Sequence, residues 1–87
     1  MKIKSDFILK KIAGSNVVVP VNTRAVDFSG IIKLSESGAF LWELLTEGAE
    51  KDELVAKLLD RYEVDEATAR ADVDRFVGKL EEADLLD

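Results

Sequence analysis

The side chains best suited to acid–base, nucleophilic or metal chemistry are largely missing from this sequence. It contains no histidine and no cysteine. The usual proton-transfer group at neutral pH, the thiolate nucleophile and the commonest zinc ligands are therefore absent. The 18 Asp and Glu residues fall mostly at positions expected on helix surfaces, where carboxylates are usually solvated. We therefore expect a protein that is not an enzyme, with no metal site and no cofactor.

Length and composition predict one folded domain over residues 1–87. The hydrophobic fraction of 47% is sufficient for a core, and a chain of this size forms one domain at most. No apolar run approaches the roughly 20 residues that span a bilayer. The first residues lack the apolar core and cleavage site of a signal peptide. We expect a cytoplasmic protein without disulfides.

Charge is divided unevenly along the chain. Residues 1–34 carry six Lys/Arg and two Asp/Glu, whereas residues 35–87 carry six Lys/Arg and sixteen Asp/Glu. Such a division can simply maintain solubility. It also predicts a basic sheet surface beside an acidic helical one, which can meet partners of different sign.

Three runs near the N-terminus are rich in strand-forming residues. Phe7–Ala13 and Val17–Asn22 are separated by the turn signal Gly14–Asn16, a spacing that predicts a β-hairpin. Ile31–Leu34 follows a looser connection and predicts a third strand. Its only charged residue is Lys33, so this strand would form an edge with little protection against further pairing.

Three helices are predicted in the remainder of the chain. Ser35 is expected to cap the first, and Gly48 to end it. The second covers about Lys51–Tyr62, and Asp65 should cap the third. Trp42 lies on the apolar stripe of the first helix and is expected to be core. The third helix has apolar residues at helical spacing, namely Ala69, Val73, Phe76, Val77 and Leu80.

The predicted order β-β-β-α-α-α is typical of the α+β class, with a three-stranded antiparallel sheet and the helices on one of its faces. Several segments of this sequence, in this order, resemble the PqqD family, named from pyrroloquinoline quinone biosynthesis and also called RiPP recognition elements. The similarity covers roughly Val17 to Leu86. The segments are Leu34-Ser35-Glu36-Ser37-Gly38, Leu41-Trp42-Glu43-Leu44-Leu45, Leu54 and Leu58 with Tyr62-Glu63-Val64, and Asp72-Val73 with Phe76, Leu80 and Leu85.

The resemblance implies a winged-helix-like domain that acts as a non-catalytic peptide chaperone. Such domains bind the leader segment of a ribosomally made precursor peptide. The leader adds as a strand beside the third strand, against the third helix, and is presented to a modifying enzyme. In quinone biosynthesis that enzyme is a radical S-adenosylmethionine (radical SAM) protein. The resemblance leaves open whether the product is pyrroloquinoline quinone or another modified peptide.

The exposed third strand and the resemblance together predict a peptide-binding groove. Strand addition requires an open edge for backbone hydrogen bonds and side-chain pockets for specificity. Gly78, inside the third helix, is either tolerated there or allows a peptide to approach closely. The predicted peptide-binding residues are Ile31, Ile32, Lys33, Leu34, Asp72, Arg75, Phe76 and Lys79.

Two other classes of function remain open at this stage. Winged-helix domains commonly bind DNA through a recognition helix. The third helix here is acidic and would repel phosphates, which disfavours this class. A structural dimerisation module that pairs through its own edge strand is the other alternative, so a monomer and an edge-paired homodimer both fit the sequence.

Overall fold

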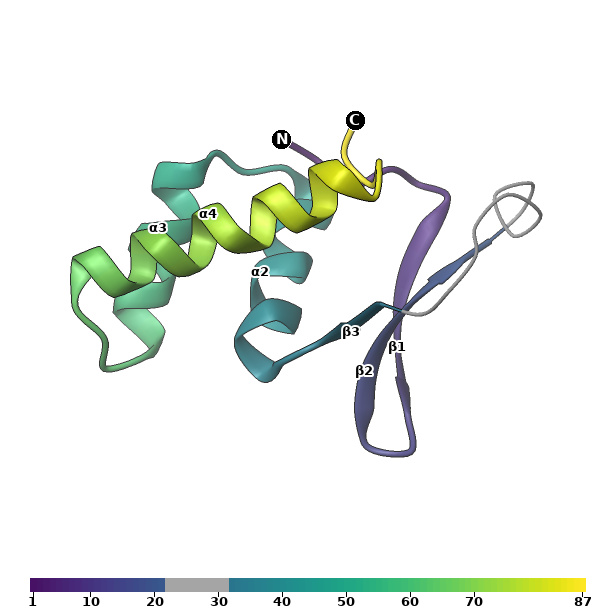
Figure 1. Ribbon diagram of the computed structural model, residues 1–87, viewed down its shortest axis with the longest axis horizontal. Helices are drawn as coiled ribbons and strands as arrows, with labels where there is room; N and C mark the ends of the chain where they lie inside the picture. Colours follow the sequence, from purple (N-terminus) through teal and green to yellow (C-terminus); the bar gives the residue numbers. More distant parts are fainter. Residues whose placement is uncertain (22–31) are drawn as a thin grey trace.

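The structure is a computed structural model that describes residues 1–21 and 32–87. The described residues form three strands followed by helices, as Figure 1 shows. This arrangement confirms the predicted α+β class and element order. The elements are β1 (Phe7–Ile12), β2 (Ser15–Pro20), β3 (Ile32–Leu34), α2 (Glu36–Glu47), α3 (Lys51–Arg61) and α4 (Glu66–Glu82).

The first two strands form the predicted hairpin, but its turn differs from the prediction. Antiparallel pairing runs from Phe7 opposite Pro20 to Ile12 opposite Ser15, so the loop is only the two residues Ala13 and Gly14. Their φ angles are 51° and 82°. Positive φ at both loop residues matches the right-handed twist of the strands. The turn therefore starts one residue before the predicted Gly14–Asn16 segment and shares only Gly14 with it, since Ser15 and Asn16 already belong to β2.

The third strand lies at an edge of the sheet. The strand order is β1-β2-β3, and β3 pairs antiparallel with β2, with Leu34 opposite Asn16 and Ile32 opposite Val18. The other side of β3 has no strand partner among the described residues. The predicted start at Ile31 lies outside the described residues.

The helix ends follow the predicted capping chemistry. The Gly38 amide donates a hydrogen bond of 3.2 Å to Ser35 Oγ at the start of α2. At the start of α4 the Thr68 amide donates to Asp65 Oδ1 at 2.7 Å. Hydrogen bonds from the Thr68 side chain and from this amide lower the pKa of the Asp65 carboxyl. Both cap predictions are confirmed. The second helix ends at Arg61, one residue earlier than expected, because Tyr62 has extended backbone.

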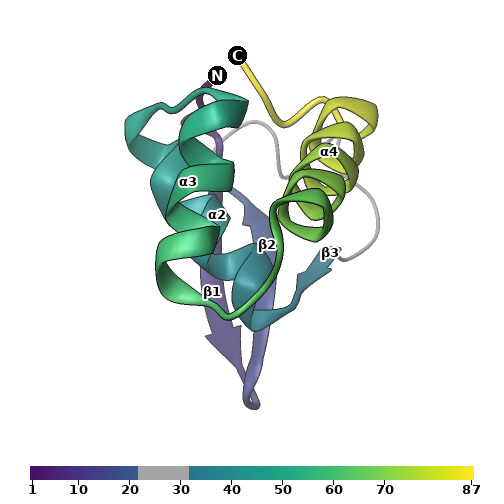
Figure 2. The same ribbon diagram turned by 90° about the vertical axis from the view of Figure 1, so that its left-hand side faces the viewer.

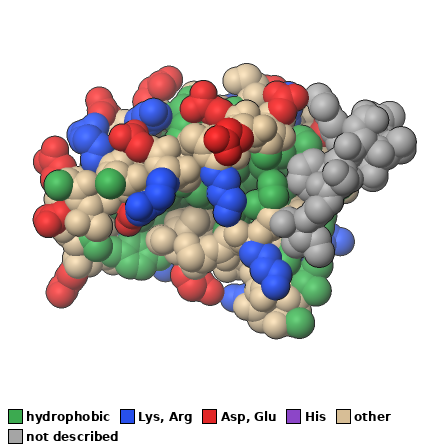
Figure 3. Space-filling view, in the orientation of Figure 1, with side chains coloured by type: hydrophobic (Ala, Val, Ile, Leu, Met, Phe, Trp, Pro, Cys, Tyr) green, Lys and Arg blue, Asp and Glu red, His purple; other side chains and the backbone are tan. Residues whose placement is uncertain are grey.

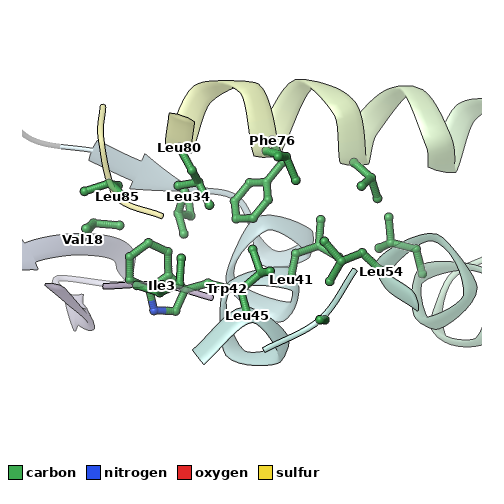
Figure 4. Packing of buried hydrophobic residues seen from close by; sticks show 14 of the residues in the cluster. Ile3, Val18, Leu34, Leu41, Trp42, Leu45, Leu54, Phe76, Leu80 and Leu85 are labelled. Carbon is green, nitrogen blue, oxygen red and sulfur yellow. The ribbon is translucent and has the colours of Figure 1, made fainter. Parts of the chain in front are cut away.

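The core lies where the inner face of the sheet meets the three helices. Trp42 is 2% exposed, and Val18, Leu45 and Leu80 are even less exposed. Figure 4 shows Phe76 pointing from α4 toward Leu41, while Leu80 lies near Leu34. The predicted core positions of Trp42 and of the α4 stripe are confirmed.

The two chain ends lie together beside the end of α4, as Figure 1 shows. Ile3 and Leu86 form an antiparallel bridge. The Lys4 amide donates to Leu85 O, and the Asp87 amide donates to Lys2 O, both at 2.9 Å. Leu85 is fully buried. These contacts fix the C-terminal end of α4 relative to the hairpin.

Candidate functional site

A groove of about 610 Å³ runs between the open side of β3 and α4. Figures 1 and 2 both show α4 beside β3. Lys33 and Leu34 line the groove from β3, and Arg75, Phe76 and Lys79 line it from α4. Figure 3 views this face and shows Lys and Arg side chains along the flank of α4 and toward β3. The edge strand and the helix are therefore opposite walls of one groove.

The floor of the groove is apolar and closely packed. Leu34, Leu41 and Phe76 line it, with exposures of 8%, 2% and 9%. Gly38, in the first turn of α2, allows Leu34 of β3 to pack closely against that turn. A Cβ atom on Gly38 would lie 3.3 Å from Leu34 Cβ and 3.6 Å from Phe76 Cε1. The first distance is shorter than an ordinary van der Waals contact, so the close approach of Leu34 to α2 depends on the absence of a side chain at Gly38.

Replacement of Gly38 by alanine is expected to destabilise the fold by about 1–3 kcal/mol, because it overpacks the junction of β3, α2 and α4. A Gly-to-Ala exchange within a helix usually has the opposite effect and raises the free energy of unfolding by up to about 1 kcal/mol. Urea denaturation measures the change. Gly78→Ala is the matched control, since a Cβ there meets no atom within 4 Å and should stabilise α4. A Gly38→Ala variant as stable as the wild type would contradict the close packing described for this floor.

The rims of the groove carry charges of both signs. Arg75 forms an ion pair with Asp72 on its own helix, and Asp74 pairs with Lys51 of α3 at 3.4 Å. Lys33 and Lys79 form no ion pair with any residue in the described ranges 1–21 and 32–87. These two exposed lysines, one on each wall, are therefore available to an anionic group that enters the groove.

The predicted site residues are distributed as follows in the structure. The groove brings together Lys33 and Leu34 from β3 with four residues of α4. Ile32 does not line the groove but packs, half-buried, against the core. Ile31 lies outside the described residues. The four predicted α4 residues at the groove are Asp72, Arg75, Phe76 and Lys79.

Sequence reasoning missed several lining residues. Ser35, Ser37 and Gly38 line the groove from the start of α2, and Leu58 reaches it from α3. The Ser-x-Ser-Gly spacing after β3 was a usable signal, since a glycine in a first helical turn indicates close approach of another element. The contribution of Leu58 had no local signal, because it depends on how α3 packs against α4.

The groove has the features of a binding site for an extended chain. Among the described residues no group of three or more Asp or Glu side chains could hold a metal ion. The groove instead offers an apolar floor, a strand edge with no strand partner within residues 1–21 and 32–87, and two lysines with no ion pair in those ranges. A strand edge can form backbone hydrogen bonds with an added chain, and the floor can bury alternate side chains of that chain. None of the helices within residues 1–21 and 32–87 combines the length and the hydrophobicity that a membrane span requires.

These features define a small α+β domain in which an open strand edge faces a helix across an apolar groove. Residues 7–86 match the sequence profile of the family described as coenzyme PQQ synthesis protein D (PqqD). The chain belongs to the PqqD family. No curated protein matches it by sequence.

Two solved structures are similar to this fold. One is described as "TbiB1 in Complex with the TbiA(beta) Leader Peptide", with a TM-score of 0.78 and 28% sequence identity. That similarity covers 100% of this chain and 95% of the other. The second is described as "Lasso peptide synthetase B1 complexed with the leader peptide", with a TM-score of 0.72 and 17% identity over 93% of this chain and 89% of the other.

Proposed function

We propose that this protein binds the leader segment of a ribosomally made precursor peptide as an added strand on β3, and presents it to a modifying enzyme. The observation that carries the proposal is the groove itself, in which the open edge of β3 faces α4. The protein supplies binding and orientation, and the enzyme supplies the chemistry. This arrangement would operate in the cytoplasm, where ribosomal precursors are made.

The backbone of β3 provides the generic part of the affinity. Strand addition pairs the free N–H and C=O groups of an edge with an extended chain of any sequence. Each such hydrogen bond contributes only about 0.5–1.5 kcal/mol net. A three-residue strand such as Ile32–Leu34 therefore cannot provide tight binding alone, and the opposite wall must contribute.

Side chains of the groove provide the selective part. Successive side chains of an added strand point to opposite faces of the sheet. Those on the face of Leu34 would enter the apolar floor, where Leu41 and Phe76 lie. Acidic residues of the leader would meet Lys33 and Lys79, which have no carboxylate partner in the described ranges. We therefore expect a leader that combines apolar and acidic residues.

Similarity to leader-peptide complexes supports the identity of the ligand. TbiB1, at 28% identity, is described in complex with the TbiA(beta) leader peptide. The chain also belongs to a family named for coenzyme PQQ synthesis. By the family resemblance, the modifying enzyme is a radical SAM protein with iron–sulfur clusters. The leader and that enzyme are thus the two proposed partners.

The proposal predicts that Lys79→Glu weakens peptide binding about threefold to tenfold without changing the melting temperature, since an exposed ion pair contributes up to about 1 kcal/mol and its reversal adds repulsion. The probe is a peptide selected for binding to the wild-type protein from a displayed library. The library combines leader sequences encoded by short reading frames near the gene with random linear peptides. Calorimetry gives the affinity, and amide chemical shifts locate the binding site. We expect shifts in Lys33–Leu34 and along Arg70–Lys79.

Lys57→Glu on α3 is the matched control, because Lys57 is exposed, lies outside the groove and changes the net charge equally. Shifts confined to the β1–β2 hairpin or to α3 would refute the proposed site. Tight binding of duplex DNA at physiological salt would favour the winged-helix DNA-binding class instead. If the selection yields no binding peptide, and the protein is a homodimer that dissociates when β3 is mutated, the result would favour a dimerisation module.

A further inference from the structure

The strand β1 forms the second edge of the sheet, opposite β3. It has no strand partner other than β2 within residues 1–21 and 32–87. Figure 2 shows β1 on the side of α3, whereas β3 lies on the side of α4. A peptide that occupies the groove between β3 and α4 therefore leaves the edge of β1 free.

The outward-facing backbone groups of β1 belong to Leu9 and Lys11. The Val21 amide donates a hydrogen bond of 2.8 Å to Asp6 O. Every second residue from Asp6 onward therefore bonds to β2, and the residues between them face outward. The Leu9 and Lys11 amides have no hydrogen-bond partner among the described residues. The N–H and C=O groups of both residues can thus pair with an added strand.

A hollow of about 460 Å³ lies beside this edge, between the hairpin and the helices. Leu9 and Lys11 line it from β1, and Phe40 and Tyr62 line it from the helical side. The two rings meet edge to face with their centres 6.1 Å apart, and the Arg61 guanidinium lies 5.1 Å from the centre of the Phe40 ring. Aromatic and arginine side chains are enriched in protein–protein interfaces.

The charges at this edge favour an acidic partner. The β1–β2 hairpin carries two lysines, Lys10 and Lys11, and no carboxylate, in a chain with a net charge of −6. Lys11 pairs with Glu36 at 3.8 Å. Lys10 and Arg61 form no ion pair with any residue in the described ranges. Both also line the hollow, where Glu43 is the other carboxylate.

A second copy of this chain fits the edge of β1 poorly. Symmetric antiparallel pairing of two β1 strands centred on Lys10 or on Lys11 places that lysine opposite its own copy. Like charges directly opposite each other destabilise a sheet, and lysines on an edge strand commonly prevent such self-pairing. An acidic strand has the complementary charge and avoids this repulsion.

We propose that the edge of β1 binds an extended acidic segment of a second protein by strand addition, while the leader occupies β3. The proposal rests on the proposed function, which identifies the second protein as the modifying enzyme. Side chains of the added strand on the same face as Leu9 would point into the hollow. An apolar side chain there would meet Phe40 and Tyr62, and a carboxylate would meet Arg61. The sheet would thus hold the leader and the enzyme at its two edges.

The test uses a displayed library of short overlapping segments that tile the proteins encoded near the gene. Amide hydrogen exchange is measured by NMR for the free protein and for its complex with a selected segment. We expect the Leu9 and Lys11 amides to exchange about tenfold more slowly, or slower still, in the complex, because each gains a hydrogen bond. The Lys10 amide bonds to β2 in both states and is the internal reference. Saturation with the leader peptide should leave this protection unchanged.

Arg61→Glu is expected to weaken binding of the selected segment about tenfold or more, because it removes the guanidinium contact and repels the acidic strand. Lys57→Glu is the matched control, since Lys57 is exposed on the same helix, lies outside the hollow and changes the net charge equally. Arg61→Glu should bind the leader peptide as the wild type does, because Arg61 lies outside the groove between β3 and α4. That result would show that the variant is folded.

Segments that bind only between β3 and α4, or a library that yields no binder, would overturn the β1 site. The proposed function would stand in either case if a leader peptide still binds β3. Protection of Leu9 and Lys11 in a homodimer of the free protein would replace the enzyme segment by a second copy. Binding of a segment at β1 of a protein for which no leader is found would contradict the proposed function and the assignment of the partner as a modifying enzyme.

Discussion

Replacing Trp42 by alanine should lower the free energy of unfolding by about 3–5 kcal/mol, as large-to-small exchanges of buried aromatic residues do. The side chain is 2% exposed and belongs to the cluster that joins Ile3 and Val18 to the helices. Domains of this size have total stabilities of roughly 5–15 kcal/mol. The variant should therefore be close to unfolding at physiological temperature. Urea denaturation followed by far-UV circular dichroism measures the change.

Leu59→Ala on α3 provides the comparison for Trp42→Ala. Leu59 is 36% exposed, and surface exchanges usually change stability by no more than about 0.5 kcal/mol. The two variants thus separate loss of core packing from loss of any large apolar side chain. A Trp42→Ala protein that unfolds at the same urea concentration as Leu59→Ala would show that Trp42 does not organise this core.

Methylation of single backbone nitrogens in the bound peptide should produce the second large effect. An added strand directs alternate N–H groups toward β3 and the others away from it. A methyl group on an inward nitrogen removes a hydrogen bond and clashes with the edge. We expect losses of about tenfold to a hundredfold at these positions, since the hydrogen bond alone contributes roughly 0.5–1.5 kcal/mol. Calorimetry on a set of singly N-methylated peptides gives the pattern.

The alternation is the decisive feature of this experiment. Nitrogens that point away from β3 serve as internal controls. Methylation there restricts the peptide backbone in the same way as at the inward positions, but the methyl group does not contact β3. A two-residue period in the affinity losses would support strand addition on Ile32–Leu34. Losses with a period of three or four residues would indicate a helical ligand, and uniform losses would indicate an unstructured one. Either result would replace the proposed binding mode.

Local patterns in the sequence were sufficient for the elements and for most of the core. Ser35 and Asp65 cap their helices as expected because capping needs only a side-chain oxygen within three residues of an amide. The apolar stripe of α4 is buried as its spacing predicts. The hairpin turn was misplaced by about one residue because Ala13, an unusual residue at positive φ, adopts the conformation expected of glycine or asparagine.

The candidate groove combined local and long-range information. The unguarded character of Ile31–Leu34 and the surface charges of α4 were visible in the residue types alone. Which residues line the groove was only partly predicted. Ile32 packs against the core rather than lining the groove, and Gly38 and Leu58 line it without having been predicted. Register and packing decide such positions, because a one-residue offset in a strand reverses the face of every side chain.

The sequence by itself thus determined the α+β order, the helix caps, the buried Trp42 and the absence of histidine and cysteine, since each depends on residue type or on neighbours within a few positions. Tertiary structure alone decided that Ile32 packs against the core while Gly38 and Leu58 line the groove, and that the surroundings of the two glycines of the groove differ. A Cβ atom on Gly38 would lie only 3.3 Å from Leu34 Cβ, whereas a Cβ atom on Gly78 would meet no atom within 4 Å. The physical reason is that the width of a groove is set by distances between segments far apart in the chain, which no local pattern encodes.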